Sequence, residues 1–347
     1  MVVIVGAGVV GSAAAYYLST SPYLSSTQRI KILDSVGPAA ASSGKAGAFI
    51  TNRPPLKRGN ASDKRQALFE KSFELHEWLA EELNLESFCT VKNYQVVNEL
   101  SNQDNDDGHH QQTNSPPQPL WLSNIKNSHE GVALPGDAAI LDPTELTAAL
   151  FNEVLARNDD SSFLRATVRG LELDEENRAV QKVLVELGKG DCAIDYIAIE
   201  EDEPVLFGRK DRSLYVSGCG ESEVIGTEVL RSEERPRPDM CPPNMARAAA
   251  AQKSLKTLGY KKSEPDRVQA CMRPMSPDAV PVVGKILSNV YVATGGGPWG
   301  ITWGPLMGKC IESLINEEDP PIRLGPLKPQ RFDTLLYQTL LKSRSPM

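Results

Sequence analysis

The sequence lacks several features that would assign it to common classes of protein. No apolar stretch is long enough to cross a bilayer. The net charge is −8 and the pI is about 5.3, so neither nucleic acid nor an anionic membrane is an expected partner. The cysteines form no C-x-x-C pair, which argues against a metal site and favours a reducing compartment. They are scattered along the chain as Cys89, Cys192, Cys219, Cys241, Cys271 and Cys310.

Histidine is also scarce, and no histidine falls in a metal-ligand or catalytic-triad pattern. The four histidines are His76, His109, His110 and His129. We therefore expect no metal ion. Met1 directly precedes an apolar strand, so we expect no targeting peptide ahead of the fold and a cytoplasmic protein.

The N-terminus instead carries a dinucleotide-binding fingerprint in its required context. An apolar run over residues 1–5 leads into Gly6-Ala7-Gly8-Val9-Val10-Gly11 and an Ala-rich helix, and a second apolar run over residues 30–33 ends in Asp34. Gly6 permits the tight turn, Gly8 permits close approach of a pyrophosphate, and Gly11 permits close packing of helix on strand. The alternative is an ordinary strand–helix–strand unit in which the glycines serve packing alone.

Asp34 also restricts the choice of nucleotide. Its carboxylate can accept hydrogen bonds from ribose hydroxyls and would repel a 2′-phosphate, so NADP is disfavoured. FAD and NAD both remain open on this motif alone.

The remainder of the chain is organised unevenly. Helical periodicity or capping predicts helices over residues 64–83, 142–157 and 243–258, and alternating apolar residues predict strands over 163–173, 180–187 and 214–219. Residues 101–119 are rich in Asn, Gln, Asp, Ser and Pro, and we expect a disordered insertion there.

A second glycine-rich turn lies in the C-terminal third. A predicted strand over residues 267–272 delivers Arg273-Pro274, and a strand over 290–294 runs into a glycine turn at 295–300. A helix should begin near 303–305 and run through 314. Trp299 and Trp303 would either wall a ligand pocket or belong to the core. The turn itself would either approach a ligand closely or only reverse the chain.

Together, these motifs resemble the FAD-dependent oxidoreductases of the D-amino-acid oxidase and glycine oxidase superfamily. The resemblance rests on the N-terminal fingerprint, the Ser/Ala/Gly-rich residues 41–47, Arg273-Pro274, the Asp-x-x-Pro-x-x-Gly pattern at 278–284 and the glycine turn at 295–304. It implies an α/β fold in which a Rossmann-like FAD-binding domain is intertwined with a smaller α+β substrate domain built on an antiparallel sheet. The FAD-binding domain would comprise residues 1–62, 140–195 and 265–347, and the substrate domain residues 63–139 and 196–264.

The resemblance also implies roles for individual residues. Arg273 would hold a substrate carboxylate, which a guanidinium can do through two parallel hydrogen bonds; alternatively it is a structural arginine paired with Asp278 or a backbone carbonyl. Val168 would meet the adenine through its backbone, and the residues that open the last helix would face the flavin. The expected FAD-binding residues are Gly6, Ala7, Gly8, Val9, Val10, Gly11, Asp34, Ser42, Ser43, Lys45, Ala46, Gly47, Val168, Gly297, Gly300, Ile301 and Thr302.

One departure from the family concerns residues 190–204. Family members carry an apolar strand here that ends in a glycine and is followed by further strands, whereas residues 191–200 pass directly into an acidic tract. We predict an internal deletion, which would leave one parallel strand of the cofactor domain unpaired.

The predicted function is oxidation of a small amine or amino acid by hydride transfer to FAD. Three alternatives remain: an NAD-linked dehydrogenase, an FAD enzyme for a substrate without nitrogen, and an inactive flavin-fold protein that serves as an interaction module.

Overall fold

The computed structural model describes residues 1–23, 29–54, 65–98, 129–133, 136–157, 161–174, 176, 179–187, 205–208, 214–217, 225, 228–229, 232, 237–257 and 264–332. The expected disordered insertion at 101–119 and the expected deletion point at 190–204 both lie outside the described residues.

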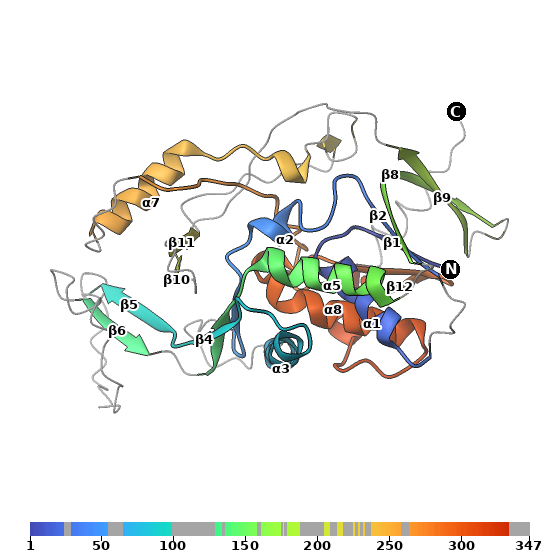
Figure 1. Ribbon diagram of the computed structural model, residues 1–347, viewed down its shortest axis with the longest axis horizontal. Helices are drawn as coiled ribbons and strands as arrows, with labels where there is room; N and C mark the ends of the chain where they lie inside the picture. The colour runs from blue at the N-terminus through green and yellow to red at the C-terminus, as the bar shows by residue number, and fades with distance from the viewer. Residues whose placement is uncertain are drawn as a thin grey trace.

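A mixed sheet forms one side of the molecule (Figure 1). Among the described residues it has four strands in the order β1 (Val2–Val5), β2 (Ile30–Asp34), β8 (Ser162–Leu173) and β9 (Val180–Leu187). β1 and β2 are parallel, as are β2 and β8, whereas β9 returns antiparallel to β8. The register pairs Val5 with Leu33 and Asp34 with Arg165, so β1 and β2 end at the same edge.

Three helices pack together beside this sheet. They are α1 (Val9–Thr20), α5 (Pro143–Arg157) and α8 (Gly300–Ile315), and α1 contacts both of the others. The start of α5 follows directly from the sequence. Pro143 occupies its first turn, and Oδ1 of Asp142 accepts a hydrogen bond from the N–H of Thr144 at 2.7 Å.

Glycines permit a close approach between α1 and α8. A Cβ atom at Gly304 would lie 2.6 Å from Cγ1 of Val9, and one at Gly308 would lie 2.6 Å from the backbone nitrogen of Ala14. The earlier residue of α8, Gly304, meets the earlier residue of α1, Val9, and the later residue, Gly308, meets the later one, Ala14. The two helices therefore run parallel. Their N-termini, separated by almost 300 residues of sequence, therefore lie at the same end of the molecule.

The remaining strands form small antiparallel sheets. β3 (Phe49–Thr51), β7 (Ala138–Ile140) and β4 (Cys89–Val91) make one of three strands. The two-stranded pairs are β5 (Tyr94–Asn98) with β6 (His129–Ala133), β10 (Val205–Gly208) with β11 (Leu214–Ser217), and β12 (Val282–Leu287) with β13 (Val290–Thr294).

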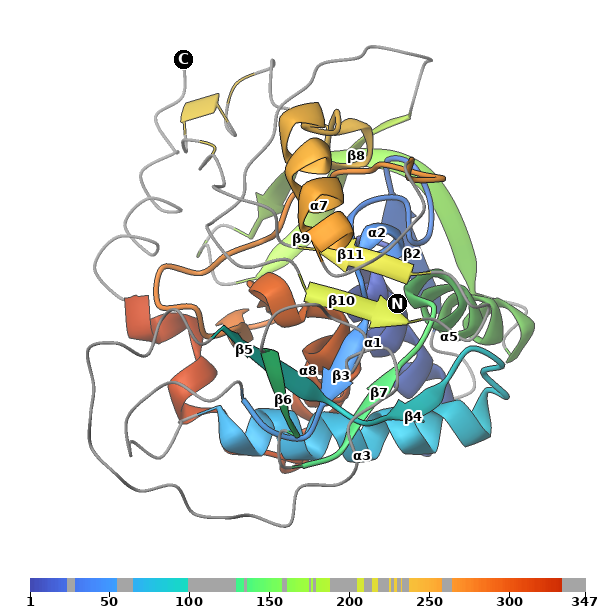
Figure 2. The same ribbon diagram turned by 90° about the vertical axis from the view of Figure 1, so that its left-hand side faces the viewer.

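Two further long helices and several short ones complete the fold. α3 (Gln66–Glu82) packs on α8, and α7 (Met245–Thr257) lies near the β10–β11 pair (Figure 2). The short helices are α2 (Ser42–Lys45), η2 (Pro238–Met240), η3 (Gly297–Trp299), η4 (Gly325–Leu327) and η5 (Pro329–Phe332). No helix in the described part of the chain combines the length and apolar character needed to span a bilayer.

Two expectations for the C-terminal third were wrong. Residues 267–272 form no strand, because the carbonyls of Ala270 and Met272 bond to side chains of α2 instead of to a neighbouring strand. The last helix begins at Gly300, before the predicted 303–305, and therefore contains Pro305 in its interior.

β1 lies at the end of the strand order but consists only of apolar residues, as an interior strand would. All four of its residues are apolar, yet none is fully buried and Val5 is 60% exposed. Among the described residues β1 pairs only with β2. Parallel sheets are normally covered on both faces and have apolar interior strands, so this edge has the composition of an interior strand.

Candidate functional site

The turn between β1 and α1 requires its glycines. Gly6 has a φ of +105°, a value that side chains disfavour, and its N–H donates to the carbonyl of Leu33 at 2.7 Å. A Cβ atom at Gly11 would lie 1.9 Å from the carbonyl oxygen of Gly6, so only glycine lets α1 pack this closely on the turn. One at Gly8 would lie 2.9 Å from Oγ of Ser43.

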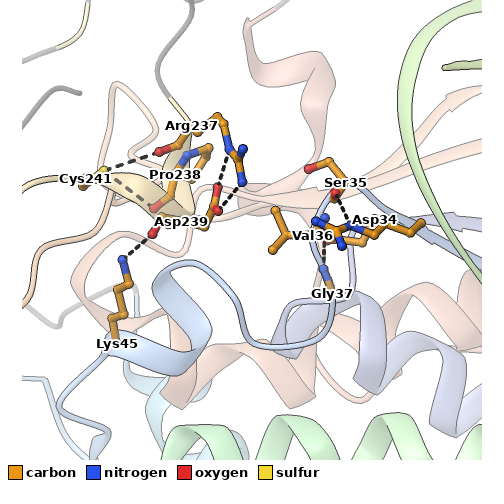
Figure 3. Close-up of polar contacts among 10 residues, drawn as sticks. Asp34, Ser35, Val36, Gly37, Lys45, Arg237, Pro238, Asp239 and Cys241 are labelled. Carbon is orange, nitrogen blue, oxygen red and sulfur yellow. Dashed lines mark hydrogen bonds and ion pairs between the residues drawn. The ribbon is translucent and has the colours of Figure 1, made fainter. Parts of the chain in front are cut away.

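Asp34 at the end of β2 stabilises this turn. Its Oδ2 accepts the N–H of Ala7 at 2.9 Å. Its Oδ1 accepts the N–H groups of Val36 at 2.8 Å and Gly37 at 3.0 Å (Figure 3). An ionised carboxylate offers about four lone-pair positions. The three backbone bonds therefore leave capacity for one more donor, such as a ribose hydroxyl, whose binding here remains a prediction.

The short helix α2 faces two directions. Oγ of Ser43 accepts the N–H of Val9 at 3.0 Å, so this hydroxyl lies at the N-terminus of α1. Ser42 and Lys45 instead bind the C-terminal segment. Oγ of Ser42 donates to the carbonyl of Met272 at 2.8 Å, and Nζ of Lys45 donates to the carbonyl of Ala270 at 3.0 Å. Nζ of Lys45 also donates to the carbonyl of Asp239 at 2.7 Å (Figure 3).

These contacts refine the expected roles of residues 42–47. Ser43 is next to the glycine turn and suited to a phosphate oxygen. The ammonium of Lys45 is occupied by two backbone carbonyls, so its observed role is to hold the segment that leads to Arg273. Ala46 and Gly47 follow α2 directly and continue toward β3.

Arg273 lies where this segment reaches the second glycine turn. The carbonyl of the next residue, Pro274, accepts the N–H of Gly297 at 3.0 Å, and Met275 forms an isolated bridge with Gly296. Arg273 is exposed and makes no hydrogen bond or ion pair with any described residue. Its backbone therefore lies next to the second glycine turn, and its guanidinium has no partner among the described residues.

The alternative pairing of Arg273 with Asp278 is wrong. Asp278 pairs with Arg331 in a two-pronged contact, Nε to Oδ2 at 2.8 Å and Nη2 to Oδ1 at 3.0 Å. Hydrogen bonding from Arg331 is the main reason why the pKa of Asp278 is lowered.

The start of α8 is buried and held from two sides. Ile301 is 5% exposed and Thr302 is 1% exposed, and Oγ1 of Thr302 donates to the carbonyl of Phe49 at 3.2 Å. A helix N-terminus carries partial positive charge and favours an anionic group placed near it. Space is open at Gly300, where a Cβ atom would meet nothing within 4 Å.

The aromatic residues near this turn pack with one another. The ring of Phe69 lies edge-on to those of Trp299 and Trp303, with centroids 4.9 and 5.2 Å away. Trp303 is 1% exposed and belongs to the buried core. Val168, expected at the adenine, lies on β8 three residues beyond Arg165, the partner of Asp34, and is half-buried.

Sequence reasoning missed His76. This side chain on α3 is fully buried, and its Nε2 lies 3.1 Å from the carbonyl oxygens of both Ile301 and Thr302. Burial lowers the pKa of His76 to about 4, against the opposing effect of the two carbonyls, so the ring is neutral. The available signal was its position: His76 shares the apolar face of its helix with Phe69 and Phe73.

Comparison with known proteins agrees with this geometry. The sequence profile of the DAO family, described as "FAD dependent oxidoreductase", matches residues 1–199 and 192–314. The chain therefore belongs to this family of FAD-dependent oxidoreductases. A Schizosaccharomyces pombe protein named "Putative oxidoreductase C1F5.03c" is 25% identical over 379 residues, covering 90% of this chain and 93% of that protein.

Two solved structures share the fold. L-Amino acid deaminase from Proteus myxofaciens has a TM-score of 0.70 at 16% identity, covering 95% of this chain and 93% of that one. Iminodiacetate oxidase from Chelativorans sp. BNC1 has a TM-score of 0.69 at 15% identity, covering 95% and 99%. The fold is accordingly that of a flavoenzyme with a Rossmann FAD domain, as expected.

The residues present fit FAD. Gly8 carries no side chain at the N-terminus of α1, the hydroxyl of Ser43 lies there, and Asp34 retains acceptor capacity at the end of β2. The parallel packing of α1 and α8 brings a second helix N-terminus to the same end.

Proposed function

We propose that this FAD-dependent oxidoreductase oxidises an amine or amino acid that carries a carboxylate group, with Arg273 binding that carboxylate. The observation that carries the proposal is that Arg273 is exposed, has no partner among the described residues, and directly precedes the residues that contact the glycine turn ahead of α8. Arginine matches a carboxylate through two parallel charge-assisted hydrogen bonds.

Each part of the site has a role in this proposal. The FAD-binding residues are those predicted from the sequence, with the α1 turn and Ser43 toward the pyrophosphate and Gly297, Gly300, Ile301 and Thr302 toward the flavin. Of that set, Ser42 and Lys45 act indirectly, through the segment 270–272 that they hold. When bound, FAD supplies the redox chemistry by accepting a hydride from the substrate carbon. Arg273 orients the substrate, and the N-terminus of α8 favours negative charge on the adjacent ligand.

The printed names of the structural neighbours support the substrate class. An L-amino acid and iminodiacetate each combine an amine with a carboxylate, and the proteins named for them share this fold. This chemistry is what a free arginine next to a flavin site would recognise.

We also propose the discontinuous domain division given above. It is supported by the packing of β1, β2, β8, α1, α5 and α8, which come from three separated parts of the chain. The substrate domain would then consist of the two segments 63–139 and 196–264.

Anaerobic flavin reduction tests the role of Arg273. Loss of a charge-assisted contact costs about 1.5–3 kcal/mol, so Arg273→Ala should raise the half-saturating concentration of a reactive amino acid roughly ten- to a hundredfold. Arg273→Lys should recover only part of this, because an ammonium cannot reproduce the two-pronged geometry. The reduction is followed through the visible absorbance of the flavin.

Arg169→Ala serves as the matched control, since Arg169 forms an exposed ion pair with Glu186 on the β8–β9 ribbon. It should leave flavin reduction unchanged. If Arg273→Ala retains its flavin and is reduced with the wild-type rate and half-saturation, the arginine does not bind substrate.

A second candidate, a flavin-fold protein without catalytic activity, is favoured by the open edge of β1. Under this alternative the purified protein would retain FAD that no candidate amine or amino acid reduces, although a chemical reductant such as dithionite would reduce it.

A further inference from the structure

The helix that approaches the flavin site contains a proline that should weaken its first turn. Pro305 lies inside α8, five residues after its first residue. Proline has no backbone N–H and cannot donate to the carbonyl four residues earlier, which here belongs to Ile301. The carbonyl of Ile301 is thereby deprived of its normal helical donor.

His76 supplies the missing donor from a different helix. Its Nε2 lies 3.1 Å from the Ile301 carbonyl oxygen and 3.1 Å from that of Thr302. Both partners are acceptors only, so Nε2 carries the proton and donates to both. The other ring nitrogen, Nδ1, is buried without a hydrogen-bond partner among the described residues, which leaves Nε2 as the bonded end of the ring.

The hydrogen bonds from His76 fix the orientation of backbone N–H groups as well as of the two carbonyls that accept them. A peptide unit is planar, so fixing the carbonyl of Ile301 also fixes the N–H of Thr302. Thr302 is one of the residues expected to face the flavin, and its Oγ1 is tied to Phe49 on the other side. A hydrogen bond accepted by a carbonyl also polarises its own peptide unit, which makes the N–H a stronger donor.

We propose that His76 is a positioning residue for the flavin: it replaces the hydrogen bond that Pro305 removes and thereby holds the first turn of α8 toward the cofactor. The inference rests on the proposed placement of Gly300, Ile301 and Thr302 at the flavin. It does not depend on the substrate class or on Arg273.

The test measures the midpoint potential of bound FAD, with dithionite or an electrochemical mediator as reductant and no substrate present. His76→Leu keeps an apolar side chain of moderate size and removes the donor. Loss of one hydrogen bond corresponds to roughly a tenfold change in an equilibrium, so reduced FAD should lose about tenfold in affinity relative to oxidised FAD. This is a fall of about 30 mV for a two-electron couple.

Two further variants separate positioning from folding. His76→Gln retains an amide donor and should keep a potential near that of wild type. Pro305→Ala restores a backbone N–H at position 305, so the double variant His76→Leu with Pro305→Ala should recover most of the lost potential. A merely structural histidine would lower thermal stability without moving the potential, and Pro305→Ala would not rescue the potential.

The proposal is overturned if His76→Leu binds FAD with an unchanged potential, or if the double variant fails to recover it. If His76→Leu does not fold, wild type is compared with Pro305→Ala and with the double variant, and a double variant that folds but shows a low potential overturns it. A wild-type chain that cannot be loaded with FAD also overturns it. Failure of amino acids to reduce the flavin would contradict only the proposed substrate class.

Discussion

At the scale of single residues, several polar groups are committed to backbone partners. The carboxylate of Asp34 accepts three backbone N–H groups, the ammonium of Lys45 donates to two carbonyls, and the imidazole of His76 donates to two more. These side chains therefore shape the segments that surround the site. Arg273, in contrast, has no such partner in the described structure and is available to a ligand.

The burial of His76 predicts a dependence of stability on pH. Its pKa is about 4 in the folded protein against an ordinary value of 6.5, so the unfolded chain takes up the proton first as the pH falls. This contribution to stability is complete above pH 6.5 and is lost progressively toward pH 4. The lost free energy of unfolding is up to about 3 kcal/mol.

Urea unfolding of wild type and His76→Gln at a series of pH values measures this contribution. Glutamine keeps a donor but does not titrate, so its stability should fall less between pH 6.5 and 4. Carboxylates such as Asp278 titrate in both proteins and cancel in the difference. Parallel pH profiles for the two proteins would contradict the assignment.

At the scale of elements, the contact between α1 and α8 determines the geometry of the site. Gly304 and Gly308 allow the parallel helices to approach until a Cβ atom at either position would overlap α1. This brings the N-terminal ends of two helices distant in sequence to one place. Ser43 of α2 and the segment ending at Pro274 then connect these two ends.

Gly308→Ala should therefore destabilise the protein. The new Cβ atom would lie 2.6 Å from the backbone nitrogen of Ala14 and 2.7 Å from Cβ of Ala13. Overpacking costs about 1–3 kcal/mol, which should exceed the gain in helix propensity of up to about 1 kcal/mol. Gly325→Ala, where a Cβ atom meets nothing within 4 Å, is the control. Thermal unfolding should show a lower Tm for Gly308→Ala alone, and an unchanged Tm would contradict the close packing.

The same elements show what the sequence could and could not predict. α3, α5, β8 and β9 lie within one or two residues of expectation, because apolar periodicity and the Asp142–Pro143 start are local signals. The segment before Arg273 has the apolar composition of a strand, but its carbonyls bond to Ser42 and Lys45, which are more than 220 residues away in sequence. His76 was missed for the same reason, since its partners lie on α8.

At the scale of the whole molecule, no second strand pairs with β1 in the part of the chain that the structure describes. In the doubly wound order the strand that precedes the glycine turn lies inside the sheet, with a neighbour on each side. Here β1 has one partner among the described residues, and Val5 is 60% exposed. This is the unpaired strand that an internal deletion would leave.

The comparisons support the same interpretation. The family profile matches in two parts that meet at residues 192–199. The alignment with the Schizosaccharomyces pombe relative extends over 379 positions, more than the 347 residues of this chain, so that relative contains residues that this chain lacks. We keep the deletion near residues 190–204 as a prediction, with an extra parallel strand beside β1 in the complete form.

A chimera tests this prediction. Residues 190–204 are replaced by the corresponding segment of the Schizosaccharomyces pombe relative, which this prediction requires to be the longer of the two, and a glycine-serine insertion of equal length serves as the control. Burying the four apolar residues of β1 adds to the free energy of unfolding at about 25 cal/mol per Å² of apolar surface removed from water. The new strand would also form hydrogen bonds with the backbone groups on this edge of β1. The chimera should therefore unfold at a higher temperature and retain more FAD per chain after gel filtration than either the original protein or the control. Equal melting temperature and flavin content in all three proteins would show that the open edge of β1 is not the place of a missing strand.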